Sequence, residues 1–545
     1  MNLSSAKTSL KTPHNTRINL SHTLHTSTDF MYFKPLLVQE MLPSDSFDIS
    51  ITDYFRAGVL PQPVYGEVQL SKAAFFVPNR ILWKEWNTFL TGGQNGRETR
   101  EMPRYLLGSL ARYINNDAMN AQMKHLTKDF LTDMGIPFGV LDETAGLGTQ
   151  SVSALPFRAV KRVWWDWYRD SNLIGDEVED SYNFKGDVDA REYTNGPAGW
   201  SSYDNIHPMP VPFEKDYFTT AFQEPQRGED SYAPVVLPDA RLNPSLGTPR
   251  TTNSVITNGT IIGQQSSPGG ATDVIGRVKY NALRLAHGLQ HWLERNNIAG
   301  ANALQQLLAH WGTAPNPAVF NRSTFINDSD SILNIDEIVN TASEQGNVTT
   351  KINGSAPFHT SYTANEHGYL IIIQVMRPKT GYYQGLAREL QRFDRFDYFT
   401  PEMECTGFQP IYTKELYATN EYGEDSIFGY APRYAEYKFK NNRVSGDYAD
   451  PEFGRYLHFN RDLSAMNDAG IIGSISPDFT AGYDAAIYGA DFSRVFQDNN
   501  VDYDHFLQVC QFKISASRPM RGYDVPLFNE EEGSDVSIPY AGVRL

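Results

Sequence analysis

The alternation of apolar and polar positions is clearest between residues 68 and 86. Val68 and Leu70 alternate with polar neighbours, and residues 73–77 then form an unbroken apolar run. Because proline fixes φ and lacks a backbone donor, a central strand should end at Pro78. Residues 81–86 then add four large apolar side chains. This stretch predicts a buried strand that leads directly into a second hydrophobic layer.

Shorter stretches repeat the strand pattern. Apolar side chains occupy every second position in residues 47–51, 435–439 and 510–516. Residues 369–376 are apolar except for Gln374, which fits a strand buried on both faces. Strands near both ends of the chain must pair across large sequence separations. The pattern therefore predicts a mainly β sandwich of the Greek-key or jelly-roll kind, with long loops and helices inserted between strands.

A helix with a basic side is predicted over residues 158–170. Its apolar positions recur at three- and four-residue intervals, and basic residues are interleaved with the tryptophans. Basic groups beside aromatic rings can bind single-stranded DNA. The alternative is a tryptophan stripe in the core with a basic side that faces solvent or another subunit. The candidate nucleic-acid-facing residues here are Arg158, Lys161 and Arg162.

A second helix is predicted over residues 278–296, where six apolar residues form one stripe. His287, His291 and Glu294 share the opposite face, but Gly288 stands where a zinc enzyme would carry its catalytic glutamate. Residues 327–331 resemble the start of a calcium loop but lack its glycine, and we expect an acidic turn there. We therefore predict no metal site and no cofactor.

The first 28 residues differ in character from the rest. They are rich in serine, threonine and asparagine, contain no acidic residue, and carry Lys7, Lys11 and Arg17. Such a segment cannot bury enough apolar surface to fold alone. We expect residues 1–28 to be a basic arm, either on the inner wall of a container, where those three residues touch DNA, or a solvated tail.

Composition and charge narrow the function. The 545-residue chain has a net charge of −17, so it is unsuited to coating nucleic acid without a basic partner. Its two cysteines, Cys405 and Cys510, predict free thiols rather than a disulfide framework. No run is long and apolar enough for a membrane span or a signal core. No nucleotide-binding fingerprint or nucleophile elbow occurs, so we do not expect an enzyme.

The stretch of residues 68–86 also resembles a known protein family. The sequence FFVPNRILWKEW, with Phe75, Phe76, Pro78, Asn79, Arg80 and Trp83 as its signature, resembles a strand near the N-terminus of Microviridae major capsid proteins of the gokushovirus type. Further similar pieces follow in the family's order, and together they cover most of the chain. They are residues 28–30, 40–47, 155–159, 216–219, 281–286, 433–437, 504–507 and 516–520.

The resemblance implies a specific architecture and function. It implies a single viral jelly roll, an eight-stranded antiparallel sandwich, over residues 29–545. Residues 228–276, which are small, polar and turn-prone, occupy the place of the family's exterior protrusion, with a role in host attachment. The function implied is a structural capsid protein that forms pentamers and a T=1 icosahedral shell around circular single-stranded DNA.

The resemblance also implies partners and a location. The partners would be further copies of the chain, an internal scaffolding protein, a small basic DNA-binding protein, a pilot protein and a host surface receptor. The protein would reside in the virion after assembly in the cytoplasm of the host bacterium. The alternative is a lectin-like jelly-roll module that binds carbohydrate through its aromatic, loop-rich surface.

Overall fold

The computed structural model describes most of the chain between residues 15 and 520. The described residues are 15–58, 60, 62, 64–115, 121–142, 150–174, 209–228, 235–236, 256–257, 260–261, 277–278, 280–299, 303–312, 322–339, 348–404, 406–419, 422–423, 426–450, 452–481, 492–497 and 503–520. Lys7, Lys11, Cys405 and most of the predicted protrusion lie outside them.

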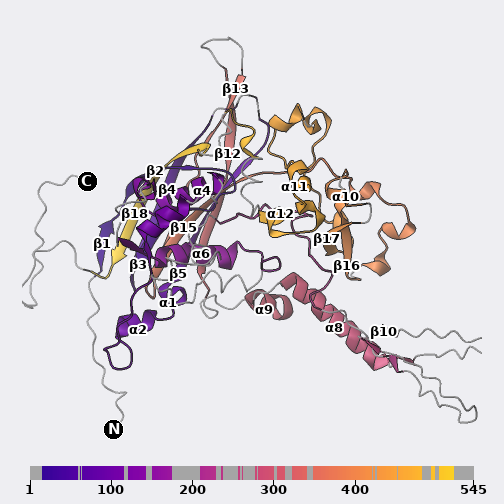
Figure 1. The fold of residues 1–545 in the computed structure, drawn as a ribbon, viewed down its shortest axis with the longest axis horizontal. Helices are drawn as coiled ribbons and strands as arrows, with labels where there is room; N and C mark the ends of the chain where they lie inside the picture. Colours follow the sequence, from indigo (N-terminus) through magenta and orange to yellow (C-terminus); the bar gives the residue numbers. More distant parts are fainter. Residues whose placement is uncertain are drawn as a thin grey trace, which may run out of the picture.

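Ten antiparallel strands form the body of the molecule (Figure 1). Their order is β1-β18-β4-β13-β12-β5-β15-β3, with β14 also paired to β4 and β2 also paired to β18. The bounds are β1 Thr16–Asn19, β2 His22–Thr28, β3 Lys34–Met41, β4 Ser46–Ala57, β5 Val68–Pro78, β12 Thr324–Val339, β13 Val348–Gly354, β14 Phe358–Thr363, β15 Gly368–Pro378 and β18 Phe506–Arg518.

The long strand β12 joins the two sides of a sandwich. Its first part pairs with β5 and its second part pairs with β13. A buried cluster lies between the sides, with Phe47 and Ile514 from β4 and β18 packed among Phe76 and Ile372 from β5 and β15. The predicted mainly β jelly-roll sandwich is confirmed. Among the described residues the sheet has ten strands rather than the predicted eight, because the N-terminal residues add β1 and β2 along β18.

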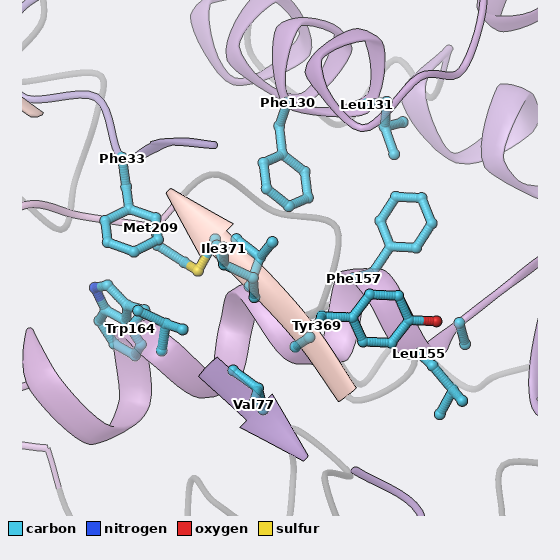
Figure 2. Close-up of a cluster of buried hydrophobic side chains, with 14 of the residues drawn as sticks. Phe33, Val77, Phe130, Leu131, Leu155, Phe157, Trp164, Met209, Tyr369 and Ile371 are labelled. Carbon is cyan, nitrogen blue, oxygen red and sulfur yellow. The ribbon is translucent and has the colours of Figure 1, made fainter. Parts of the chain in front are cut away.

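Strand β5 is central because both of its faces are buried. Phe76 points into the sandwich, whereas Phe75 and Val77 belong to a second cluster on the outer side of the sheet (Figure 2). This double burial explains the unbroken apolar run in the sequence. β5 ends at Pro78, as expected, and α1 (Asn79–Leu82) begins at the next residue. Trp83 is buried in the same outer cluster.

Helices form the layer that covers this outer face. In Figure 2, Phe130 and Leu131 from one helix and Phe157 and Trp164 from another surround Ile371 of β15. The predicted second hydrophobic layer is therefore helical. Its elements are α2 Trp86–Thr91, α3 Leu107–Ile114, α4 Ala121–Asp133, α5 Phe138–Asp142 and α6 Leu155–Trp167, with the short strands β6 Arg104–Leu106 and β7 Ser151–Ser153.

A third cluster lies under the irregular segment between β15 and β18. Phe30, Phe218 and Phe459 are among its buried aromatic residues. The segment contains β16 Phe408–Tyr412, α10 Thr413–Leu416, β17 Ile427–Pro432, α11 Ser464–Asp468 and α12 Pro477–Ala481. It also has 3₁₀ turns at Arg388–Leu390, Arg395–Asp397, Pro401–Met403, Ala435–Tyr437, Gly446–Ala449, Gly454–Tyr456 and Ile471–Gly473.

The helix predicted over residues 278–296 is α8 (Tyr280–Ala299), followed by α9 (Ala303–Trp311). Figure 1 shows α8 projecting away from the sheets. Two pairs of short strands lie within or next to the predicted protrusion: β8 Val235–Val236 pairs with β11 Arg277–Val278, and β9 Ile256–Thr257 pairs with β10 Thr260–Ile261. Among the described residues, no helix combines the length and apolar character needed to cross a bilayer.

Three local predictions are corrected. Residues 435–439 form a 3₁₀ turn rather than a strand, because Tyr434 takes a left-handed conformation that ends the extended backbone. Residues 327–331 lie within β12 rather than in a turn. The second half of the predicted basic arm is part of the sheet, since β1 and β2 both pair with β18 of the same chain.

Candidate assembly and nucleic-acid interfaces

The predicted basic side of α6 is buried. Arg158 is 0% exposed, and its Nη1 donates a hydrogen bond to the carbonyl of Leu82, 3.0 Å away. Sheet, helices and loops enclose α6, so its basic residues face protein rather than solvent. This position gives no support to the prediction that Arg158 contacts DNA, because the side chain is buried inside the protomer and has no exposed surface for a phosphate.

The other two α6 candidates are also held inside the protomer. The Lys161 ammonium lies 5.0 Å from the centre of the Trp164 ring. Arg162 Nε donates to Asp166 Oδ2 over 3.0 Å, and that carboxylate also accepts bonds from the backbone and hydroxyl of Ser323. Both cations are engaged within the core, and neither is presented to a nucleic acid.

Arg17 is the candidate that the structure leaves at the surface. It is exposed on β1, where its Nε donates to Ser515 Oγ over 2.7 Å. Arg17 and Lys513 line a surface hollow of about 480 Å³, and Asp48 contributes a carboxylate to it. The hollow thus contains two basic side chains close to the first described residues. The basic residues Lys7 and Lys11 precede it in the sequence.

The structure reveals an exposed surface that sequence reasoning missed. It consists of exposed aromatic residues together with the exposed Arg395 and the partly buried Arg388 and Arg392, and we call it the arginine–aromatic surface. The Arg392 guanidinium lies 4.5 Å from the centre of the Tyr437 ring, and Phe393 is 90% exposed. Its members are Arg388, Arg392, Phe393, Arg395, Phe396, Tyr398, Phe399, Tyr437 and Phe439.

Two of the three arginines of this surface are paired with carboxylates. Arg388 Nη1 is 2.8 Å from Glu415 Oε1, and Arg392 Nη2 is 3.8 Å from Glu436 Oε1. Burial raises the pKa of Glu415, although the Arg388 charge opposes that effect. A groove for nucleic acid needs a net positive charge, whereas arginine and aromatic side chains with balanced charge are typical of protein interfaces. The surface therefore suits a protein partner. Its sequence signal was the interleaving of arginines and aromatics in residues 388–399.

Helix α8 presents a second open apolar face. Leu285 is 75% exposed, and Leu289 and Trp292 are about half exposed, whereas Leu293 is buried. The helix was predicted correctly, but most of its apolar stripe has no cover among the described residues. His287 and His291 on the predicted polar face are also exposed.

Comparisons with known proteins identify the family. Residues 8–528 match the family described as capsid protein (F protein). The chain is 27% identical to capsid protein VP1 of Chlamydia phage 1 over 515 residues, which covers 78% of this chain and 83% of that protein. It is 25% identical to capsid protein VP1 of Bdellovibrio phage phiMH2K, covering 80% and 83% of the two chains.

Capsid protein VP1 of Spiroplasma virus 4 is 24% identical over 473 residues, covering 78% of this chain and 81% of that protein. These relatives are gokushovirus capsid proteins, as the FFVPNRILWKEW motif predicted. A match to a capsid protein family over almost the whole chain argues against the lectin-like alternative. The family match, these relatives and the jelly-roll sandwich lead to one conclusion: the chain belongs to the capsid protein (F protein) family of the Microviridae.

Proposed function

We propose that the chain is the major capsid protein of a small phage. In this proposal it self-associates into pentamers, and the pentamers close into a T=1 icosahedral shell around circular single-stranded DNA. The arginine–aromatic surface carries the proposal. Monomeric proteins rarely expose large contiguous apolar patches, and such patches usually mark interfaces. The occupant we assign is a second copy of the chain, because members of this family build shells from copies of themselves.

The open face of α8 and the adjoining insertion fit the exterior of that shell. The pairing of β8 with β11 brings the two ends of the insertion together, so the residues between them leave and re-enter the fold at one place. We assign residues 228–276 to a surface protrusion that contacts a host receptor. The projection of α8 from the sheets supports this placement (Figure 1).

We assign DNA contact to the N-terminal arm. Lys7, Lys11 and Arg17 remain the candidates, since the three α6 cations are buried. The chain's charge of −17 means that other molecules must neutralise most of the genome's phosphates. A small basic DNA-binding protein suits that role. A scaffolding protein and a pilot protein complete the proposed set of partners, with assembly in the bacterial cytoplasm.

The interface can be tested at Phe393, the most exposed aromatic residue of the arginine–aromatic surface. Phe393→Asp places a charge at the centre of the proposed contact and should cost roughly 2–4 kcal/mol per contact, as for an interface hot spot. We expect the variant protein to remain folded but to sediment as small species when it is expressed with its scaffolding partner.

Phe393→Leu is the matched control, because it keeps an apolar side chain at the same position. It should assemble nearly as well as the unchanged protein. Normal shells from Phe393→Asp would show that this surface is not a subunit contact.

A further inference from the structure

Three side chains of the kinds that bind metal ions, from two distant parts of the chain, lie together beside the helical layer. His125 and Asp129 lie one turn apart on α4, so they share one face of the helix. Asp504 lies two residues before β18 and 379 residues away from His125 in sequence. The fold brings them together, since α4 packs on β3 and the segment that enters β18 reaches His125 of α4.

The geometry suits a single metal ion. His125 Nε2 lies 3.1 Å from Asp129 Oδ2 and 3.2 Å from Asp504 Oδ1. One ligand atom from each of the three residues falls within 4.8 Å of the other two. Around an ion with ligand bonds of about 2.0–2.2 Å, neighbouring ligand atoms are roughly 3–3.5 Å apart. The observed separations match that spacing.

The cluster contains a buried oxygen that has no hydrogen-bond partner among the described residues. Asp504 is only 3% exposed, and its Oδ2 accepts no hydrogen bond from the described part of the chain. Asp129 Oδ2, in contrast, lies 3.1 Å from His125 Nε2. A buried carboxylate oxygen without a donor is costly, and a cation is one way to satisfy it. The Asp504 oxygen points to a ligand independently of the spacing.

The nearby cations are engaged with other carboxylates. Lys34 Nζ lies 2.6 Å from each oxygen of Asp133, and His505 Nδ1 lies 2.7 Å from Asp29 Oδ2. Asp129 and Asp504 are two further carboxylates, and both lie within 3.2 Å of the one imidazole of His125. Negative charge is therefore crowded at this point of the fold, as is typical of a cation site.

We propose that His125, Asp129 and Asp504 form a structural site for a divalent transition metal of the zinc or manganese type. An imidazole nitrogen among the ligands favours such an ion over calcium or magnesium, which prefer oxygen alone. Three protein ligands leave room for water to complete the coordination. The ion ties α4 to the segment that enters β18, so it stabilises the packing of the helical layer on the sheets.

The test uses the full-length protein, stripped of metal with a chelator and dialysed at about pH 7.5. Zn²⁺ and Mn²⁺ are titrated separately by calorimetry, and the melting temperature is measured with and without each ion. We expect one ion per chain and a higher melting temperature with metal, because a ligand that binds only the folded state stabilises it. His125→Ala and Asp504→Asn should each weaken binding at least tenfold.

His359→Ala is the matched control. His359 lies 2.8 Å from Asp48, but this pair is exposed and is not part of the cluster. Its removal should leave the affinity unchanged. Equal binding by His125→Ala and the unchanged protein, or no saturable binding at sub-millimolar metal, would overturn the proposal. The second result would mean that a protonated His125 bridges the two carboxylates in place of a metal.

A spectroscopic measurement on the unchanged protein covers the case in which a variant fails to fold. Pulsed electron paramagnetic resonance of bound Mn²⁺ should detect coupling to one imidazole nitrogen. Bound Mn²⁺ without nitrogen coupling would place the ion elsewhere and would contradict the assignment.

Discussion

The clearest lesson at the residue scale comes from the cations of α6. Spacing alone predicts one apolar and one basic side, and on an ordinary surface helix the basic side would be solvated. Here the helix is enclosed, so Arg158 bonds a carbonyl and Arg162 pairs with Asp166. Long basic side chains bury their stems and satisfy their charged ends internally. Their role in this protomer is to hold the helical layer together.

Arg158→Ala should therefore reduce stability rather than DNA binding. The substitution leaves a cavity and removes the bond to Leu82, so we expect the free energy of unfolding to fall by about 2–4 kcal/mol. Lys84→Ala is the control, because Lys84 is exposed on the loop after α1. Denaturant titration of the purified proteins measures both. An Arg158→Ala protein with unchanged stability but DNA-poor shells would restore the DNA-facing role.

Residue-level predictions succeeded where local sequence decides the environment. The run from Ala73 to Val77 must be buried on both faces, and it is. The cluster of His125, Asp129 and Asp504 could not be predicted in this way, because two segments separated by 379 residues create it. Only the fold defines which distant side chains become neighbours.

At the scale of elements, long and regular patterns were predicted well. β4, β15, β18 and α8 all lie where the period of apolar residues placed them. The strand predicted over residues 435–439 was wrong, because Tyr434 takes a left-handed conformation directly before them and Ala435–Tyr437 form a 3₁₀ turn. β1 and β2 were missed because polar strands at an edge carry little apolar alternation.

The N-terminal strands give a test at this scale. Deletion of residues 1–14 should leave the melting temperature of the protomer unchanged, while it lowers the DNA content of assembled shells. Deletion of residues 1–28 should also lower the melting temperature, because it removes β1 and β2 from β18 and exposes the ring of Phe512, on which His22 stacks.

Thermal melting and the ratio of absorbance at 260 and 280 nm in purified shells measure the two effects. Unchanged DNA content after the shorter deletion would remove the arm from the DNA interface. An unchanged melting temperature after the longer deletion would show that β1 and β2 contribute little to the fold.

At the scale of the whole molecule, the protomer has apolar surfaces that the described part of the chain leaves uncovered. The apolar stripe of α8 was predicted from its period, but its exposure could not be, because period does not say what a helix packs against. The exposure of the aromatic residues in the arginine–aromatic surface could not be predicted from their spacing either. The exposed face of α8 and the arginine–aromatic surface are both consistent with a folded subunit that has not yet assembled. The capsid role follows from family membership. The exposed surfaces are candidate sites for the proposed self-association.

We propose that this chain builds a closed shell from copies of itself. Electron cryomicroscopy of particles from cells that express the chain with its scaffolding partner is the decisive experiment. We expect closed T=1 particles with five-fold vertices, the arginine–aromatic surface buried between neighbouring copies, and residues 228–276 on the outside. Protein that stays monomeric under these conditions, or shells that leave the arginine–aromatic surface exposed to solvent, would refute the proposal.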